Sequence, residues 1–212
     1  MDTLEEMHYF ASPVYVVSKP EFMDAVRTVS TRYEEASRER KNKENYVNLM
    51  TASYSHEPEL QDFSQYVSQT AWNILASQGF NMDNLVTYFT EMWTQEHTHL
   101  SSMETHMHGH GSQISAFYFL DVPEDACKLV IHDPRQAKVI VSLPEKDSGE
   151  ITLGSSQVVF KPQPGALIFV NAWMLHSFTK NFSDKPMRFV HMNLSVAVNE
   201  EAVAEEKAVE VV

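Results

Sequence analysis

The sequence is poor in cysteine and in positive charge, and it has no long hydrophobic run. Cys127 is its only cysteine, which excludes an internal disulfide and leads us to expect a cytoplasmic location. The 16 lysines and arginines stand against 29 aspartates and glutamates, and the net charge of −13 argues against nucleic acid as a partner. No apolar run approaches the roughly 20 residues that cross a bilayer, and the first residues do not resemble a signal peptide, so we expect no membrane partner.

Helical patterns come first along the chain. Apolar residues recur at helical spacing over residues 22–33 and again over residues 58–77. Because such stripes usually face a core, we expect two helices that support the fold and do not form its site. An extended segment at residues 10–17 precedes them, and Pro13 predicts that it lies at the edge of a sheet.

The second half of the chain has strand character, beginning with residues 85–95, which are rich in β-branched and aromatic side chains. Further strands are expected at residues 114–120, 128–132, 138–143, 157–161, 166–170, 175–180 and 189–197. This order predicts an α+β fold with an antiparallel sandwich or barrel. We expect one domain over residues 1–198, with helical support at 18–80 and the β core at 84–198. Residues 199–212 form an acidic tail that we expect to be disordered.

Histidines cluster at the start of this strand-rich half. Five of the ten lie within fourteen residues: His97, His99, His106, His108 and His110. Residues i and i+2 of a strand point to the same face, so His106 and His108 would present two imidazoles to one metal ion. The small-residue turn after them predicts that residues 114–120 return as a neighbouring strand of the same sheet. We therefore expect half of an iron site here.

A third imidazole follows far along the chain. His176 comes after the Pro164-Gly165 turn and a buried strand, and a chain reversal would deliver it from the next strand. Three ligands on one face of a metal leave positions open for substrates. Arg188 opens the last predicted strand, and its guanidinium would suit a dicarboxylate bound in bidentate fashion.

Taken in order, the motifs resemble those of the 2-oxoglutarate/Fe(II)-dependent oxygenases. They are His106-x-His108, Ser115-x-Phe-Tyr-Phe-Leu120, His132-Asp-Pro-Arg135, Pro164-Gly-x-Leu…His176 and Arg188-Phe-x-His-x-Asn193. More narrowly, the chain is similar to the "putative 2OG-Fe(II) oxygenase" group known from marine bacteria and T4-like cyanophages. The similarity extends from about residue 12 to about residue 196. A phage source would place the protein in the cytoplasm of the host.

The resemblance implies a double-stranded β-helix of the jelly-roll or cupin-like type. It also implies an oxidoreductase, a dioxygenase that uses Fe(II), the cosubstrate 2-oxoglutarate and O2 to hydroxylate a substrate and releases succinate and CO2. The substrate is left open between a protein side chain such as prolyl and a small metabolite, and an oligomer is possible. By position, His106 and His176 would bind the metal, and Arg188 would pair with the far carboxylate of 2-oxoglutarate. Tyr118, or its neighbours on that strand, would line the cosubstrate pocket.

The second metal ligand is left open by one departure from the family's pattern. A carboxylate usually stands two residues after the first histidine, and this chain has His108 there. His108 is one candidate, the pair His108 and His110 without His106 is another, and Asp133 from elsewhere in the sheet is the third. Imidazole in place of carboxylate raises the net charge of the site and should weaken its hold on a hard divalent ion.

Two functions compete with the oxygenase. One is a non-catalytic, cupin-like metal-binding module, and the other is a phage accessory or structural protein on a decayed oxygenase scaffold. The missing carboxylate would be the trace of such decay. Elsewhere, we expect His97 and His99 to be polar loop residues, and His191 and Trp93 to pack in the core.

Overall fold

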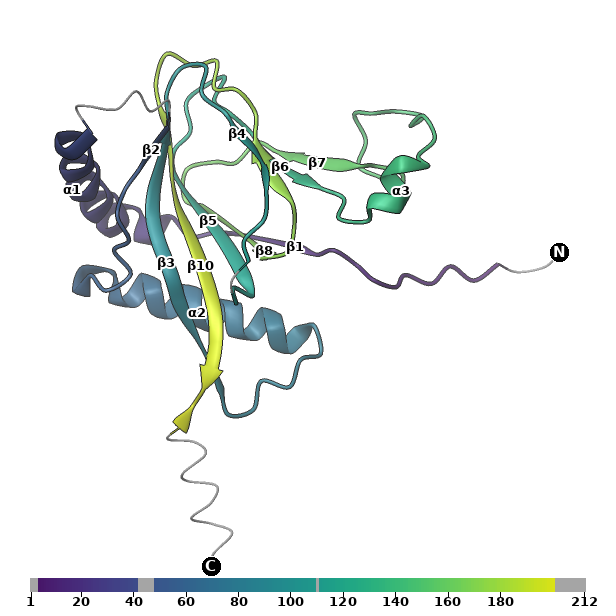
Figure 1. Ribbon diagram of the computed structural model, residues 1–212, viewed down its shortest axis with the longest axis horizontal. Coiled ribbons are helices and arrows are strands. Elements are labelled where there is room, and N and C mark those ends of the chain that lie inside the picture. The colour runs from purple at the N-terminus through teal and green to yellow at the C-terminus, as the bar shows by residue number, and fades with distance from the viewer. Residues whose placement is uncertain (1–3, 42–47, 110, 201–212) are drawn as a thin grey trace, which may run out of the picture.

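Helices α1 and α2 support two antiparallel sheets. The computed structural model describes residues 4–41, 48–109 and 111–200. In Figure 1, α1 and α2 lie beside the long strands β3 and β10, and α3 lies on a projection at the far side of the molecule. The elements follow in the order β1 (Val14–Ser18), η1 (Pro20–Phe22), α1 (Met23–Lys41), β2 (Asn48–Met50), η2 (Pro58–Leu60), α2 (Gln61–Ser77), β3 (Leu85–His97), β4 (Met103–His106), β5 (Ile114–Asp121), β6 (Leu129–His132), α3 (Gln136–Ile140), β7 (Gln157–Phe160), β8 (Ala166–Asn171), β9 (His176–Phe178) and β10 (Met187–Val198).

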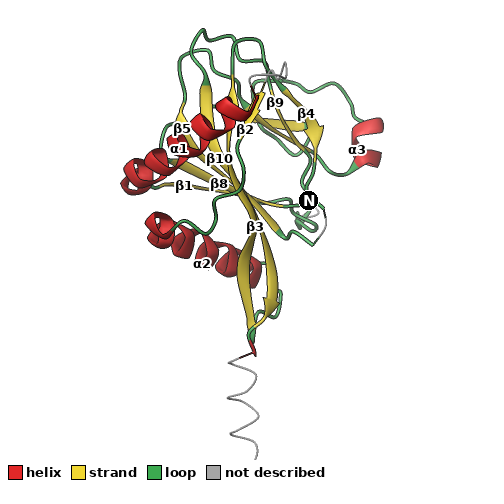
Figure 2. Cartoon of the chain, turned by 60° about the vertical axis from the view of Figure 1, so that its left-hand side comes forward, coloured by secondary structure: helices red, strands yellow, loops and turns green. Residues whose placement is uncertain are grey.

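The two sheets form a double-stranded β-helix. The six-stranded sheet has the order β1-β8-β5-β10-β3-β2, and the four-stranded sheet has the order β4-β9-β6-β7. Helices α1 and α2 lie to one side of the strands, and β4 and β9 lie to the other (Figure 2). The predicted α+β fold, with a double-stranded β-helix and supporting N-terminal helices, is confirmed, and β1 lies at a sheet edge as Pro13 predicted.

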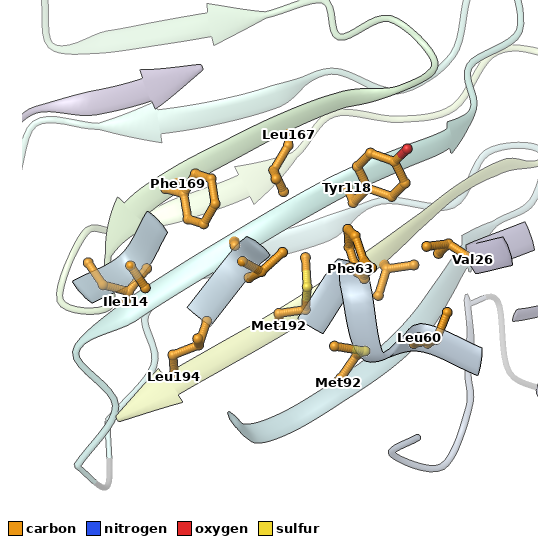
Figure 3. Close-up of a cluster of buried hydrophobic side chains, with 14 of the residues drawn as sticks. Val26, Leu60, Phe63, Met92, Ile114, Tyr118, Leu167, Phe169, Met192 and Leu194 are labelled. Atoms are coloured by element: carbon orange, nitrogen blue, oxygen red, sulfur yellow. The ribbon is translucent and has the colours of Figure 1, made fainter. Parts of the chain in front are cut away.

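One apolar core lies between the helices and the six-stranded sheet. Phe63 of α2 packs against Tyr118 of β5, with ring centroids 5.0 Å apart, and Val26 of α1 and Met192 of β10 belong to the same buried cluster (Figure 3). The helical stripes read from the sequence are therefore the faces that cover this sheet. A second core, which includes Phe117, Phe119, Leu129, Phe178 and Phe189, fills the space between the two sheets.

Two predictions of local structure are wrong. The predicted strand at residues 138–143 begins within α3 instead, and Ile140 and Val141 are exposed there, with no sheet face to bury them. The strand β5 was expected beside the first histidines in one sheet, but β4 and β5 belong to different sheets. After His106 the chain passes from the smaller sheet to the larger, and Gln113 then donates its backbone N–H to Leu194 of β10.

Ion pairs join α1 to the six-stranded sheet. The Arg188 guanidinium on β10 donates to Glu34 of α1 at 2.9 Å and to Asp121 of β5 at 2.5 Å. Arg38 of α1 donates to both carboxylate oxygens of Glu96 on β3 at 2.7 Å. The Glu34 side chain is only 4% exposed, so the fold depends on Arg188 to stabilise this buried carboxylate.

Two further expectations concern a membrane partner and the acidic tail. Among the described residues, no helix has both the length and the apolar character needed to cross a membrane. Most of the predicted acidic tail, residues 201–212, lies outside the described residues.

Replacing Arg188 by Met should destabilise the fold. The change keeps much of the side-chain volume but leaves Glu34 with a buried charge that has lost a close partner, at a cost of about 3 kcal/mol. Urea denaturation followed by circular dichroism measures the loss. The matched control is Arg32→Met, because Arg32 is 50% exposed and solvent screens its pairs with Glu57 and Glu59, so this variant should lose much less stability. Equal losses in the two variants would contradict the structural role of Arg188.

Candidate metal centre

His106, His108 and His176 come together between the two sheets. Their metal-ligating atoms all lie within 4.8 Å of one another, and no other such group of His, Cys, Asp or Glu occurs among the described residues. Antiparallel pairing of β4 with β9 sets His106 directly opposite His176, with ring centroids 4.4 Å apart. His108 follows the end of β4 and stacks on His176 at 5.2 Å. Small ring rotations would bring the three nitrogen atoms to bonds of about 2 Å with one ion.

Backbone carbonyls fix the tautomers of two of these histidines. The Nδ1 of His106 lies 2.7 Å from the carbonyl oxygen of Glu104, and the Nδ1 of His176 lies 3.0 Å from that of Met174. Because a carbonyl only accepts, each Nδ1 carries the proton and each Nε2 keeps a free lone pair. The Nε2 of His176 is buried and has no hydrogen-bond partner among the described residues, as expected of an atom that binds a metal.

Burial keeps His108 and His176 uncharged. Removal from solvent, with smaller contributions from neighbouring imidazoles, lowers the pKa of His108 to about 4 and that of His176 to about 3. Both rings are therefore neutral at physiological pH, which is the form that binds a metal ion. His106 and His108 are half-buried whereas His176 is fully buried, so the group is reached from the side of His106 and His108.

His108 is held by an amide, which the sequence analysis missed. The Nδ2 of Asn193 on β10 lies 3.1 Å from the Nδ1 of His108 and 3.3 Å from a carboxylate oxygen of Glu91 on β3. The Oδ1 of Asn193 accepts a hydrogen bond from the Ser115 hydroxyl at 2.8 Å. The Asn193 amide therefore lies between the Glu91 carboxylate and His108. The ligand group itself contains no carboxylate. The spacing of His191 and Asn193 in the last motif was the available signal, because residues two apart share a face.

Of the other two candidates for the second ligand, one is not described and the other lies apart from this group. His110 lies outside the described residues. The Asp133 carboxylate accepts two hydrogen bonds at 2.9 Å from the Arg135 side chain and pairs with Lys138 at 3.2 Å. The Arg135 hydrogen bond lowers the pKa of Asp133 to about 2. Asp133 is therefore a largely buried carboxylate braced by two cations, and the structure does not bring it to the histidines.

Arg188 and Tyr118 lie on the opposite face of the larger sheet from the histidines. Arg188 pairs with Glu34 and Asp121, and the Tyr118 hydroxyl donates to the backbone carbonyl of Lys19 at 2.6 Å. These contacts argue against the cosubstrate roles that the resemblance implied for the two side chains. The neighbours of Tyr118, Phe117 and Phe119, do face the space between the sheets.

Three further side chains, His97, His191 and Trp93, were expected in a loop or in the core. His97 is the last residue of β3, fully buried, with its Nε2 2.9 Å from the amide nitrogen of Gln95. His191 is 2% exposed, and its ring centroid lies 4.5 Å from that of His108 and 4.3 Å from that of Trp93. The prediction that His97 is a loop residue is wrong, whereas His99 is exposed and follows the end of β3.

Known proteins resemble the chain in sequence and in fold. Residues 91–193 match the family described as "Putative 2OG-Fe(II) oxygenase". No curated protein matches the sequence. AviO1 from Streptomyces viridochromogenes Tue57 has a TM-score of 0.60 and 10% identity, over 87% of this chain and 90% of its own.

Two further solved structures are prolyl hydroxylases. The prolyl-4-hydroxylase of Pseudomonas putida has a TM-score of 0.56 and 10% identity, over 87% of this chain and 93% of its own. The viral collagen prolyl hydroxylase of Paramecium Bursaria Chlorella virus-1, in complex with 2OG, has a TM-score of 0.55 and 13% identity, over 85% and 94%. At such low identity these likenesses show the fold alone.

The matched residues contain every part of the candidate site. They run from Glu91 on β3, through the three histidines, to Asn193 on β10. The predicted enzyme class, a dioxygenase with Fe(II) and 2-oxoglutarate as its cofactors, agrees with this family. Residues 91–193 of the chain therefore match the 2OG-Fe(II) oxygenase family.

Proposed function

We propose that the chain is an Fe(II)- and 2-oxoglutarate-dependent dioxygenase whose metal is held by His106, His108 and His176. The observation that carries the proposal is the approach of their ligating atoms to within 4.8 Å of one another. When bound, the metal with 2-oxoglutarate and O2 supplies the oxidant: one oxygen atom enters a substrate C–H bond, the other enters succinate, and CO2 is released. The family of the β core supports this reaction class.

The residues present fit a divalent iron ion. Imidazoles are ligands that iron accepts, and a facial set of three leaves positions open for small molecules. Hydrogen bonds from Nδ1 to backbone carbonyls orient His106 and His176, and the side-chain amide of Asn193 contacts the His108 ring. Such partners hold the rings in the geometry that a metal requires before it binds.

Apolar side chains pack behind His176. The Phe117 ring meets His176 edge-on at 5.2 Å, and it belongs to the apolar cluster between the sheets. A low-polarity wall strengthens electrostatic interactions at the site and keeps water away from reactive species. These side chains therefore limit access to the half-buried side where His106 and His108 lie.

We propose a protein side chain such as prolyl as the substrate. The likeness in fold to two prolyl hydroxylases supports this choice, and a small metabolite is the alternative that the sequence left open. The half-buried approach to His106 and His108 suits a group presented from outside the protein.

The oxygenase proposal predicts a visible absorption band. Anaerobic addition of Fe(II) and 2-oxoglutarate to the purified chain should give a weak charge-transfer band, because the keto acid chelates the metal. Admission of air should then release succinate even without a substrate. A chain that binds Fe(II) tightly but gives neither the band nor succinate would instead be a non-catalytic metal-binding module.

Replacing His176 by Ala should abolish iron binding, because only two of the three imidazole ligands would remain. Iron content after anaerobic loading and desalting measures the effect. The control is His132→Ala, since His132 lies on neighbouring β6 and bonds Ser177 at 2.8 Å without joining the ligand group. Unchanged iron content in His176→Ala, with the fold verified by circular dichroism, would remove His176 from the site.

A further inference from the structure

Several buried ring nitrogens near the ligand group have no hydrogen-bond partner within the part of the chain that the structure describes. They are the Nε2 atoms of His108, His176 and His191, the Nδ1 of His97 and the Nε1 of Trp93. A metal ion accounts for His108 and His176. The indole N–H of Trp93 is only a donor, and a buried donor without a partner is costly to the fold. A ligand that accepts hydrogen bonds would remove this cost.

Trp93 and His191 lie together directly beside the metal ligands. They are opposite each other where β3 pairs with β10, and their ring centroids are 4.3 Å apart. The His191 ring lies 4.5 Å from that of His108 and 5.9 Å from that of His176, and the Trp93 ring lies 6.3 Å from that of His108. An acceptor atom that reaches both ring nitrogens would therefore belong to a molecule bound at the metal.

Apart from the metal itself, the described residues offer that molecule no positive charge inside the fold. None of the buried residues in the described ranges is a lysine or an arginine. Arg188 faces α1 and is already paired with Glu34 and Asp121. An anionic ligand between the sheets must therefore rely on neutral donors, which form stronger and shorter hydrogen bonds with a carboxylate than with an uncharged acceptor.

We propose that Trp93 and His191 bind the carboxylate with which 2-oxoglutarate chelates the metal, by hydrogen bonds from the Trp93 Nε1–H and the His191 Nε2–H. The inference rests on the proposed function and adds the protein groups that position the cosubstrate head. Both are positioning residues for the metal-bound ligand. Phe117 stacks on the other side of His191 at 4.6 Å and holds that ring in place.

The test uses ligand affinity and does not depend on turnover. Fe(II)-loaded protein is titrated without oxygen with 2-oxoglutarate, and separately with 2-oxobutanoate, which has the same chelating head and no far carboxylate. Trp93→Phe and His191→Phe keep an aromatic ring and remove the donor. Each should weaken both ligands about tenfold, as expected for the loss of one hydrogen bond to a charged group. His191→Gln, which keeps a donor, should recover part of the affinity.

Matched controls separate this effect from general damage. Trp173→Phe and His56→Phe change residues that are exposed, and both should bind the two keto acids like the unaltered chain. Iron content should be equal in all variants. Affinities unchanged in Trp93→Phe and His191→Phe would show that the donors bind only water, and would overturn the inference while leaving the proposed function intact.

Two other results would also overturn the inference. Weakening for 2-oxoglutarate alone would place the donors at the far carboxylate and not at the chelating head. Absence of keto-acid binding by the unaltered, iron-loaded chain would overturn the proposed function together with this inference.

Discussion

The alternation of side chains along β10 is the constraint on which the site depends. Successive residues of a strand point to opposite faces of its sheet. Phe189, His191 and Asn193 face the smaller sheet and the histidines, whereas Arg188 and Val190 face the helices. A slip of one residue would exchange the two sets. The pairing of β10 with both β3 and β5 therefore holds the metal side and the ion pairs in place together.

The meeting of distant histidines could be predicted because it follows from chain order. A short His-x-His motif, a Pro-Gly turn and a later histidine specify two strands that a β-helix brings side by side, and His106 and His176 are indeed opposite each other. The packing of α1 and α2 could be predicted too, because a helix with one apolar face packs that face against the core. What these features share is that each depends on spacing within one segment or on the order of segments.

The roles of Arg188, His97 and Asn193 could not be read in the same way, because they depend on which face of a strand a residue occupies. The register of β10 against β5 shifts between Arg188 and Phe189, and nothing in the residue types there announces such an irregularity. His97 was assigned to a loop because β3 is longer than its aromatic stretch suggests. Asn193 contacts His108 only because residues far apart in the chain converge between the sheets.

The all-imidazole composition of the ligand group has a consequence for metal selection. Nitrogen ligands follow the general order of divalent affinities, in which iron binds less tightly than cobalt, nickel, copper or zinc. A carboxylate would favour the harder ions, and here the carboxylate of Glu91 acts only through Asn193. The availability of each metal ion in the cell will therefore decide which one occupies the site. Protein that is purified in air in contact with nickel or zinc ions will exchange its iron for the metal that binds more tightly.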